Sequence, residues 1–302
     1  SDDAYIKEKL YGLPLSMDTL VMFYNKDLLD SAGIALPPRQ WSDFVTMIPR
    51  LTTQDAAGNI LQSGAAMGTS SNVSRSVDLL SLLMIQNGTT LYSEERRRVE
   101  MDLARPDAKD SFPGIEALEF YTDFASPAKE VYAWNAEKPD SLEAFAAGTV
   151  GFFFGYAYHI PILEAQSTKV NWDVAPVPQT DLSVQRNFAN YWLMTVALNS
   201  DVQNEAWDFI KTVTQADIAK PYLDATLKPT ALRALIDTQR QEQFDLAVFL
   251  DQLLTAKSWY HGNQPLAMEE TIKEMIDAVV GGPQTPKESI RIAKQKIEAT
   301  YQ

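Results

Sequence analysis

The sequence predicts an α/β protein in which short strands are scattered among longer helices. Three observations lead to this prediction: short apolar runs that stop at Gly or Pro, longer segments with apolar residues at helical spacing, and no repeat of fixed period. No Pro/Gly/Ser-rich linker divides the 302 residues. If the chain forms two lobes, we therefore expect it to pass between them more than once.

The predicted strands are short and bounded by turn residues. An extended stretch begins at Leu20, and residues 150–154 form an apolar run that Gly155 ends, as expected of a buried strand. Residues 172–178 are stopped by prolines, and residues 191–198 are rich in β-branched and aromatic side chains. These four segments are the strands that we expect.

The predicted helices follow apolar spacing and end at recognisable stop signals. Residues 25–27 open a short helix that stops at Gly33, and the strand from Leu20 leads straight into it. A second helix starts near Trp41 with Ser42 as its expected N-cap. Further helical spacing occurs at 77–85 before Asn87-Gly88, and at 115–124, 142–147, 206–213, 246–255, 268–280 and 289–297.

Composition excludes several classes of protein. The 26 basic and 40 acidic residues give a net charge of −14, which disfavours nucleic acid and anionic lipid as partners. The absence of cysteine removes disulfides, thiolate metal sites and cysteine nucleophiles. No apolar run approaches the roughly 20 residues of a membrane helix.

Catalytic and cofactor signatures are absent from the sequence. There is no nucleophile elbow, phosphate loop or dinucleotide fingerprint, and His159 and His261 lie in no metal-ligand spacing. We expect both histidines on the surface or in loops, and we expect no catalytic residue, metal or cofactor. A glycosidase with two facing carboxylates stays open as an alternative, because 40 acidic residues always allow some pair to be nominated.

Aromatic residues next to glycines and predicted strand ends favour a binding site. Aromatic faces bury the apolar face of a sugar ring, and ligand crevices in α/β folds lie at the carboxyl ends of strands. Each aromatic could instead belong to the core. The candidates are Tyr156 and Tyr158 after Gly155, Tyr191 and Trp192 after Asn190, and Trp259 and Tyr260 before His261.

The segment YGLPLSMDTLVMFYNKDLLDSAGIALPPRQWSDF, residues 11–44, resembles the signature of extracellular (periplasmic) solute-binding proteins of ABC sugar importers, family 1, which includes maltose-binding protein. FAAGTVGFFFGYAY resembles a second element of that family, with Tyr where the family usually has Trp. The resemblance continues through VAPVP, the 191–192 strand, AWDFI and KPT to the helical C-terminus. It covers essentially the whole chain.

This resemblance implies a periplasmic-binding-protein-like type II fold, with two lobes around a cleft and several hinge crossings. Residues 1–19 and 186–244 would belong to the first lobe, and residues 20–185 and 245–302 to the second. The family normally opens with a block of strands and helices before the signature, whereas only residues 1–10 precede it here. We therefore expect an incomplete first lobe.

The resemblance also implies which residues contact a ligand. Ser16 and Asp18 could instead cap a turn, Asn72 could be an N-cap, and Arg75 could pair with a surface carboxylate. The positions that match the family's cleft are Ser16, Met17, Asp18, Asn72, Arg75, Tyr156, Tyr158, Tyr191, Trp192, Trp259 and Tyr260.

The implied function is that of the substrate-binding component of an ABC importer, which captures a carbohydrate or related polar solute and delivers it to the membrane permease. The implied partners are that small molecule and the importer's membrane subunits, and we expect a monomer. We expect the protein in the periplasm or outside the cell, anchored as a lipoprotein if a lipidated segment precedes it. A receptor of the same fold that senses solute without transport is the alternative.

Overall fold

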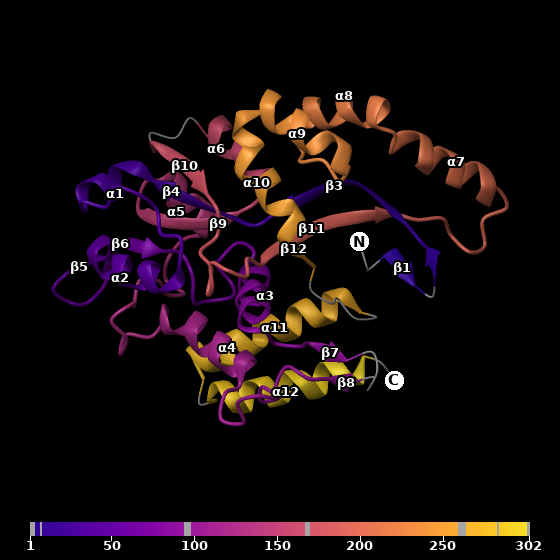
Figure 1. Cartoon of the computed structure of the whole chain (residues 1–302). Helices are drawn as coiled ribbons and strands as arrows, with labels where there is room; N and C mark the ends of the chain where they lie inside the picture. Colours follow the sequence, from indigo (N-terminus) through magenta and orange to yellow (C-terminus); the bar gives the residue numbers. More distant parts are fainter. Residues whose placement is uncertain are drawn as a thin grey trace.

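The computed structural model describes residues 4–6, 8–93, 98–166, 170–258, 264–282 and 284–300. Its largest sheet has five strands in the order β10-β4-β9-β6-β5 (Figure 1). Strand β9 runs parallel to β6, whereas β4 is antiparallel to both β9 and β10. The strands are β4 (Val21–Asn25), β5 (Thr53–Gln54), β6 (Ile60–Ala65), β9 (Val150–Gly155) and β10 (Trp172–Ala175).

Apolar side chains cover both faces of this sheet, because successive residues of a strand point to opposite faces. Met22 and Phe154 face one buried cluster, which is covered by helices from several parts of the chain. Those helices are α2 (Trp41–Leu51), α3 (Ser76–Asn87), α4 (Pro113–Asp123), α11 (Pro265–Val280) and α12 (Pro286–Ala299).

The opposite face of the sheet carries a second buried cluster. Phe23 and Phe153 point into it, and the Phe23 ring lies 5.6 Å from both the Phe153 and the Trp172 rings. The covering helices are α5 (Ser141–Ala146), α6 (His159–Ala165) and α10 (Ala247–Gln252), while α1 (Lys26–Ser31) follows β4 directly. Helices therefore cover both faces of the sheet.

A second sheet of three strands extends away from the first in the order β12-β11-β3 (Figure 1). Strand β11 (Asn187–Met194) is antiparallel to β3 (Leu13–Thr19) and parallel to β12 (Ala256–Lys257). The chain then continues through α7 (Gln203–Val213), α8 (Ala216–Thr226) and α9 (Arg233–Glu242). The remaining elements are β1 (Tyr5–Ile6), β2 (Lys9–Leu10), β7 (Tyr92–Ser93), β8 (Arg98–Val99), η2 (Phe244–Leu246) and η3 (Leu253–Thr255).

Buried amides join the chain segments where the two sheets meet. The Gln252 amide nitrogen donates to Leu20 O over 3.1 Å, and its oxygen accepts from Val177 N over 3.2 Å. The Asn187 amide accepts from the Gln179 amide over 3.0 Å. These hydrogen bonds hold segments that are far apart in the sequence close together, among them Leu20, the residue directly after β3.

Most of the predicted elements are confirmed, with two corrections. Gln40, and not Ser42, occupies the N-cap position of α2, so Ser42 lies inside the helix. The predicted strand 191–198 is shifted, since β11 starts at Asn187 and ends at Met194. Its pairing with β12 at the start and with β3 farther along fixes these limits.

Candidate functional site

Asp18 joins strand β3 to the turn that follows β9. Its Oδ1 accepts a hydrogen bond from Thr19 N over 2.8 Å, and its Oδ2 accepts one from Ala157 N over 2.9 Å. Burial raises the pKa of Asp18 to about 7, although both backbone hydrogen bonds act in the opposite direction. Asp18 is therefore bonded to the segment that carries the aromatic candidates, and its charge is sensitive to pH near neutrality.

Tyr156 and Tyr158 form a stacked pair beside Asp18. Their ring centroids lie 5.8 Å apart with an interplanar angle of 22°. Tyr156 is fully buried, whereas Tyr158 is 42% exposed. The His159 ring also packs against Tyr158, with the ring centroids 4.2 Å apart. Tyr158 is thus supported by both rings, and its exposed part is an aromatic surface of the kind that stacks against a sugar ring.

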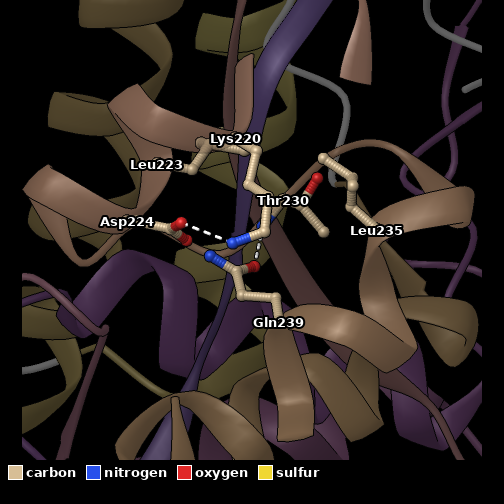
Figure 2. Close-up of a pocket in the computed structure, with 6 residues that line it drawn as sticks. All are labelled: Lys220, Leu223, Asp224, Thr230, Leu235 and Gln239. Atoms are coloured by element: carbon tan, nitrogen blue, oxygen red, sulfur yellow. Dashed lines mark hydrogen bonds and ion pairs between the residues drawn. The ribbon is translucent and has the colours of Figure 1, made fainter. Parts of the chain in front are cut away.

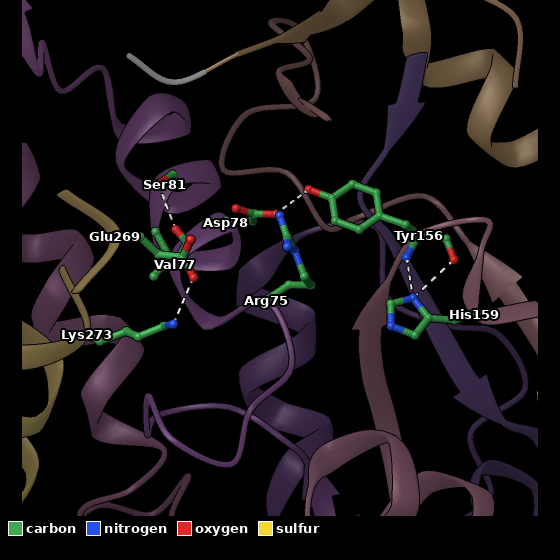
Figure 3. A network of polar contacts seen from close by, with 8 residues as sticks. All are labelled: Arg75, Val77, Asp78, Ser81, Tyr156, His159, Glu269 and Lys273. Carbon is green, nitrogen blue, oxygen red and sulfur yellow. Dashed lines mark hydrogen bonds and ion pairs between the residues drawn. The ribbon is translucent and has the colours of Figure 1, made fainter. Parts of the chain in front are cut away.

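Arg75 precedes α3 and lies near Tyr156, one member of this aromatic pair (Figure 3). Its Nε and Nη2 donate to Asp78 Oδ2 over 2.7 and 2.5 Å, and its guanidinium carbon lies 5.4 Å from the Tyr156 ring centroid. The Tyr156 hydroxyl donates to the same Asp78 oxygen over 2.6 Å. The Arg75 backbone has φ = 62°, a left-handed conformation that is uncommon for a residue other than glycine.

Asn72 holds the loop that leads to Arg75. Its amide nitrogen donates to Asn135 O over 2.9 Å and to Lys138 O over 2.8 Å. Its amide oxygen accepts from the Thr69 hydroxyl and, over 3.1 Å, from Trp134 Nε1. All four hydrogen-bonding positions of the amide are occupied by the protein, so the Asn72 side chain positions the loop.

Arg75 and its neighbours line a hollow of about 250 Å³. Figure 3 shows two of the lining residues, Glu269 and Lys273, on the side of Arg75 away from Tyr156. The wall of the hollow includes several serines of the loop before α3 and these two charged residues of α11. Lys273 Nζ and Glu269 Oε1 form an ion pair of 2.8 Å. Serine hydroxyls and paired charges are suited to polar ligands that form many hydrogen bonds.

His159 is buried, contrary to the surface or loop position that we expect from the sequence. Its Nδ1 accepts from Tyr156 N over 2.9 Å, and burial lowers its pKa to about 4. A Cβ at Gly155 would come within 2.8 Å of this Nδ1, which explains the glycine at the end of β9. His159 therefore shapes the turn as a neutral side chain, and His261 lies outside the described residues.

Ser16 and Met17 lie on β3 and are held by the turn between α8 and α9. Met17 N donates to Pro229 O over 3.1 Å, and Ser16 forms a β-bridge with Thr230. Gln239 of α9 fixes this turn: its Oε1 accepts from Thr230 N over 2.8 Å (Figure 2). Its Nε2 also donates to Lys228 O over 2.8 Å. The side chains drawn in Figure 2 leave almost no free volume between them, so they offer no room for a ligand. Their contact with β3 is the bridge between Thr230 and Ser16.

The structure separates the predicted residues of β11. Tyr191 pairs with Met17 across the sheet, and its hydroxyl donates to Ser258 Oγ over 3.4 Å. Trp192 is 88% exposed at a register shift of the strand. The contacts described above join Asp18, Arg75, Tyr156 and Tyr158 into one group, whereas Trp192 lies exposed on β11. Trp259 and Tyr260 lie outside the described residues.

Sequence reasoning missed Asp78, the carboxylate that joins Arg75 and Tyr156. The available signal was its spacing, because residues three apart on a helix are neighbours and Arg75 immediately precedes α3. Among the described residues, no group of three or more His, Asp or Glu side chains is placed to hold a metal ion.

The chain belongs to the family of bacterial extracellular solute-binding proteins, whose sequence model matches residues 1–220. It is 22% identical over 214 residues to a protein of Brucella abortus (strain 2308) that is named as a binding protein. This match covers 69% of the chain and 47% of the relative, so the chain spans about half the length of the curated relatives it matches.

Solved structures show that the fold is that of type II periplasmic binding proteins, with two lobes. An ABC transporter solute-binding protein of Thermotoga lettingae, bound with α-D-tagatose, has a TM-score of 0.73 and 20% identity. That match covers 99% of this chain and 74% of the other. A cyclic α-maltosyl-1,6-maltose binding protein of Arthrobacter globiformis has a TM-score of 0.77 and 16% identity, over 99% of this chain and 74% of its own.

Proposed function

We propose that the chain is the substrate-binding component of an ABC importer, and that it captures a carbohydrate or related polar solute. The observation that supports this most directly is the Tyr158 side chain, which is 42% exposed and stacks on Tyr156, the ring that Arg75 packs against. An aromatic surface next to hydrogen-bond donors is the combination that a sugar requires. The family and several solved neighbours are binding proteins, which agrees with this proposal.

We further propose that residues 20–185 and 245–302 form one lobe and that residues 1–19 and 186–244 belong to the other. Hydrogen bonds between distant parts of the chain support these limits, because they lie close to the proposed crossings. Leu20 N donates to Phe188 O over 3.0 Å, and the Thr19 hydroxyl donates to Phe249 O over 2.9 Å. The ligand would bind between the lobes, with β3 as one crossing.

The partners and location follow from the same proposal. The importer's membrane subunits would receive the ligand from a monomeric binding protein in the periplasm or outside the cell, with a lipid anchor if a lipidated segment precedes this chain. Within the described ranges, none of the helices combines the length and apolar character of a membrane span. The binding proposal predicts no turnover of a bound glycoside.

A thermal-shift screen tests the binding proposal. The purified chain would be melted with monosaccharides, oligosaccharides, polyols, amino acids and peptides, each at a high concentration. A ligand at 100 times its dissociation constant adds about 2.7 kcal/mol to the free energy of unfolding. We expect stabilisation by at least one sugar and none by amino acids; a cooperative melt that no sugar shifts, or hydrolysis of a bound glycoside, would contradict the proposal.

Transport and sensing differ in their partner. Reconstituted importer subunits should hydrolyse ATP faster when the sugar-loaded chain is added, because a transport protein delivers its ligand to them. A sugar-bound chain that leaves this rate unchanged would favour the sensing alternative.

A further inference from the structure

Arg75 is balanced by a buried carboxylate from within the protein. Two of its N–H groups donate to a single oxygen of Asp78, which is 6% exposed. The Tyr156 hydroxyl donates to the same oxygen, so Asp78 is fixed from two sides. The Arg75 side chain, in contrast, is 37% exposed and lines the hollow (Figure 3).

The other charges around the hollow provide no excess positive charge. Lys273 is paired with Glu269 of the same helix. Asp140 accepts from Leu142 N over 2.8 Å and from the Ser74 hydroxyl. The charged residues lining the hollow are thus two cations, Arg75 and Lys273, and three carboxylates, Asp78, Asp140 and Glu269.

We propose that Asp78 is a specificity-determining residue that cancels the charge of Arg75, so that the site accepts uncharged polyhydroxyl ligands and rejects anionic ones. This inference rests on the proposed function and narrows its substrate class. It assigns to Asp78 a role in selecting the ligand, besides its contact with Tyr156.

The chemistry of arginine explains why the pairing matters. An unpaired guanidinium binds carboxylates and phosphates in a bidentate, charge-assisted manner, and would attract acidic sugars. A guanidinium paired with Asp78 still offers N–H donors to hydroxyl groups but has little net charge. An anionic ligand would also approach Asp78 and Asp140, which costs binding free energy because like charges repel.

Calorimetric titration with matched sugar pairs tests this inference. The probes are glucose with glucuronate and galactose with galacturonate, since the members of each pair differ by one carboxylate. The proteins are the wild type, Asp78→Asn and, as a matched control, Asp208→Asn. Asp208 forms an exposed ion pair with Lys211 on α7, so its substitution causes the same change of charge on a helix that does not line the hollow.

We expect the wild type to bind the neutral member of a pair at least about tenfold more tightly than the acid. Asp78→Asn should lower this ratio by about tenfold or more, because it leaves the Arg75 charge uncompensated. Asp208→Asn should keep the wild-type ratio. The double variant Arg75→Gln/Asp78→Asn restores local neutrality and should return the ratio toward that of the wild type.

The outcomes separate this inference from the function on which it rests. Equal binding of both members by the wild type, or an unchanged ratio in folded Asp78→Asn, would overturn the role of Asp78 while sugar binding stands. Failure of every probe to bind the wild type would instead count against the proposed function. If Asp78→Asn does not fold, Arg75→Gln provides the test, since an unpaired Asp78 should strengthen the rejection of glucuronate, and an unchanged ratio would overturn the inference.

Discussion

Asp18 has both carboxylate oxygens occupied by backbone amides while burial raises its pKa to about 7. The folded protein therefore holds a proton on this group at pH values where the unfolded chain, with a pKa of about 3.9, has lost it. The contribution of Asp18 to the free energy of unfolding is fully present below about pH 4. It is lost as the pH rises toward 7.

We predict that the free energy of unfolding of the wild type, minus that of Asp18→Asn, becomes smaller as the pH rises from 4 to 7. His159 has the opposite effect, since its lowered pKa of about 4 makes stability fall as the pH drops below about 6.5. Because His159 is present in both proteins, the difference isolates Asp18. Denaturant titrations at several pH values would measure it, and a difference independent of pH would contradict the raised pKa.

Asn72 was predicted as a ligand contact, with an N-cap as the alternative, and its hydrogen bonds in the structure hold the loop before α3. Asn72→Ala should destabilise the fold by about 2–4 kcal/mol, because several buried partners, among them Trp134 Nε1, each lose a hydrogen bond. Asn59→Ala is the control, since Asn59 bonds to Asp55 at the surface and should change stability by less than about 1 kcal/mol. Equal effects in chemical denaturation would show that the Asn72 contacts do not hold the loop.

The chemistry at this scale is only partly readable from sequence. Tyr156 and Tyr158 follow a predicted strand and its glycine, so their place at a strand end could be predicted. Asp78 was harder to identify, because its spacing from Arg75 was the available signal and it lies on a helix that is buried over most of its length. Only the fold brings Tyr156, from the end of β9, to this carboxylate.

At the scale of elements, apolar spacing and stop residues predicted the helices with one buried face and the fully buried strands. The passage from β4 into α1 was predictable from the sequence, because Asn25 is a helix-capping residue. In the structure its side chain accepts from Leu28 N over 3.1 Å and caps α1. Strand β3 was not predicted as a strand from its pattern, because its residues LPLSMDT are mostly half-buried and include a proline. It is a strand because β11 pairs with it.

Gln252 provides a test of how the elements are held together. Gln252→Leu keeps a side chain of similar size but leaves Leu20 O and Val177 N without this buried partner. We expect a loss of about 1–3 kcal/mol in the free energy of unfolding. Gln203→Leu on the surface of α7 is the matched control and should be nearly neutral; a neutral Gln252→Leu would show that the amide cluster adds no stability.

At the scale of the whole molecule, the order of motifs predicted the architecture better than any single element did. Residues 11–44 combine strand β3 of one sheet, strand β4 of the other, helix α1 and the start of α2, so their order reflects how the chain passes from one sheet to the other. The match to solved structures extends over 99% of this chain with 16–20% identity in the two compared above. The ligand is not fixed by that fold, since it depends on side chains such as Tyr158 and Asp78.

Calorimetric titration of the sugar that gives the largest thermal shift, with wild type, Tyr158→Ala and Tyr222→Ala, tests the binding site most directly. Tyr158 and Tyr222 are 42% and 43% exposed, and Tyr222 lies on α8, away from the stacked pair. We predict that Tyr158→Ala weakens binding by about tenfold, because the sugar loses its aromatic surface, whereas Tyr222→Ala leaves it unchanged. Unaltered affinity in Tyr158→Ala would contradict the site, whatever sugar binds.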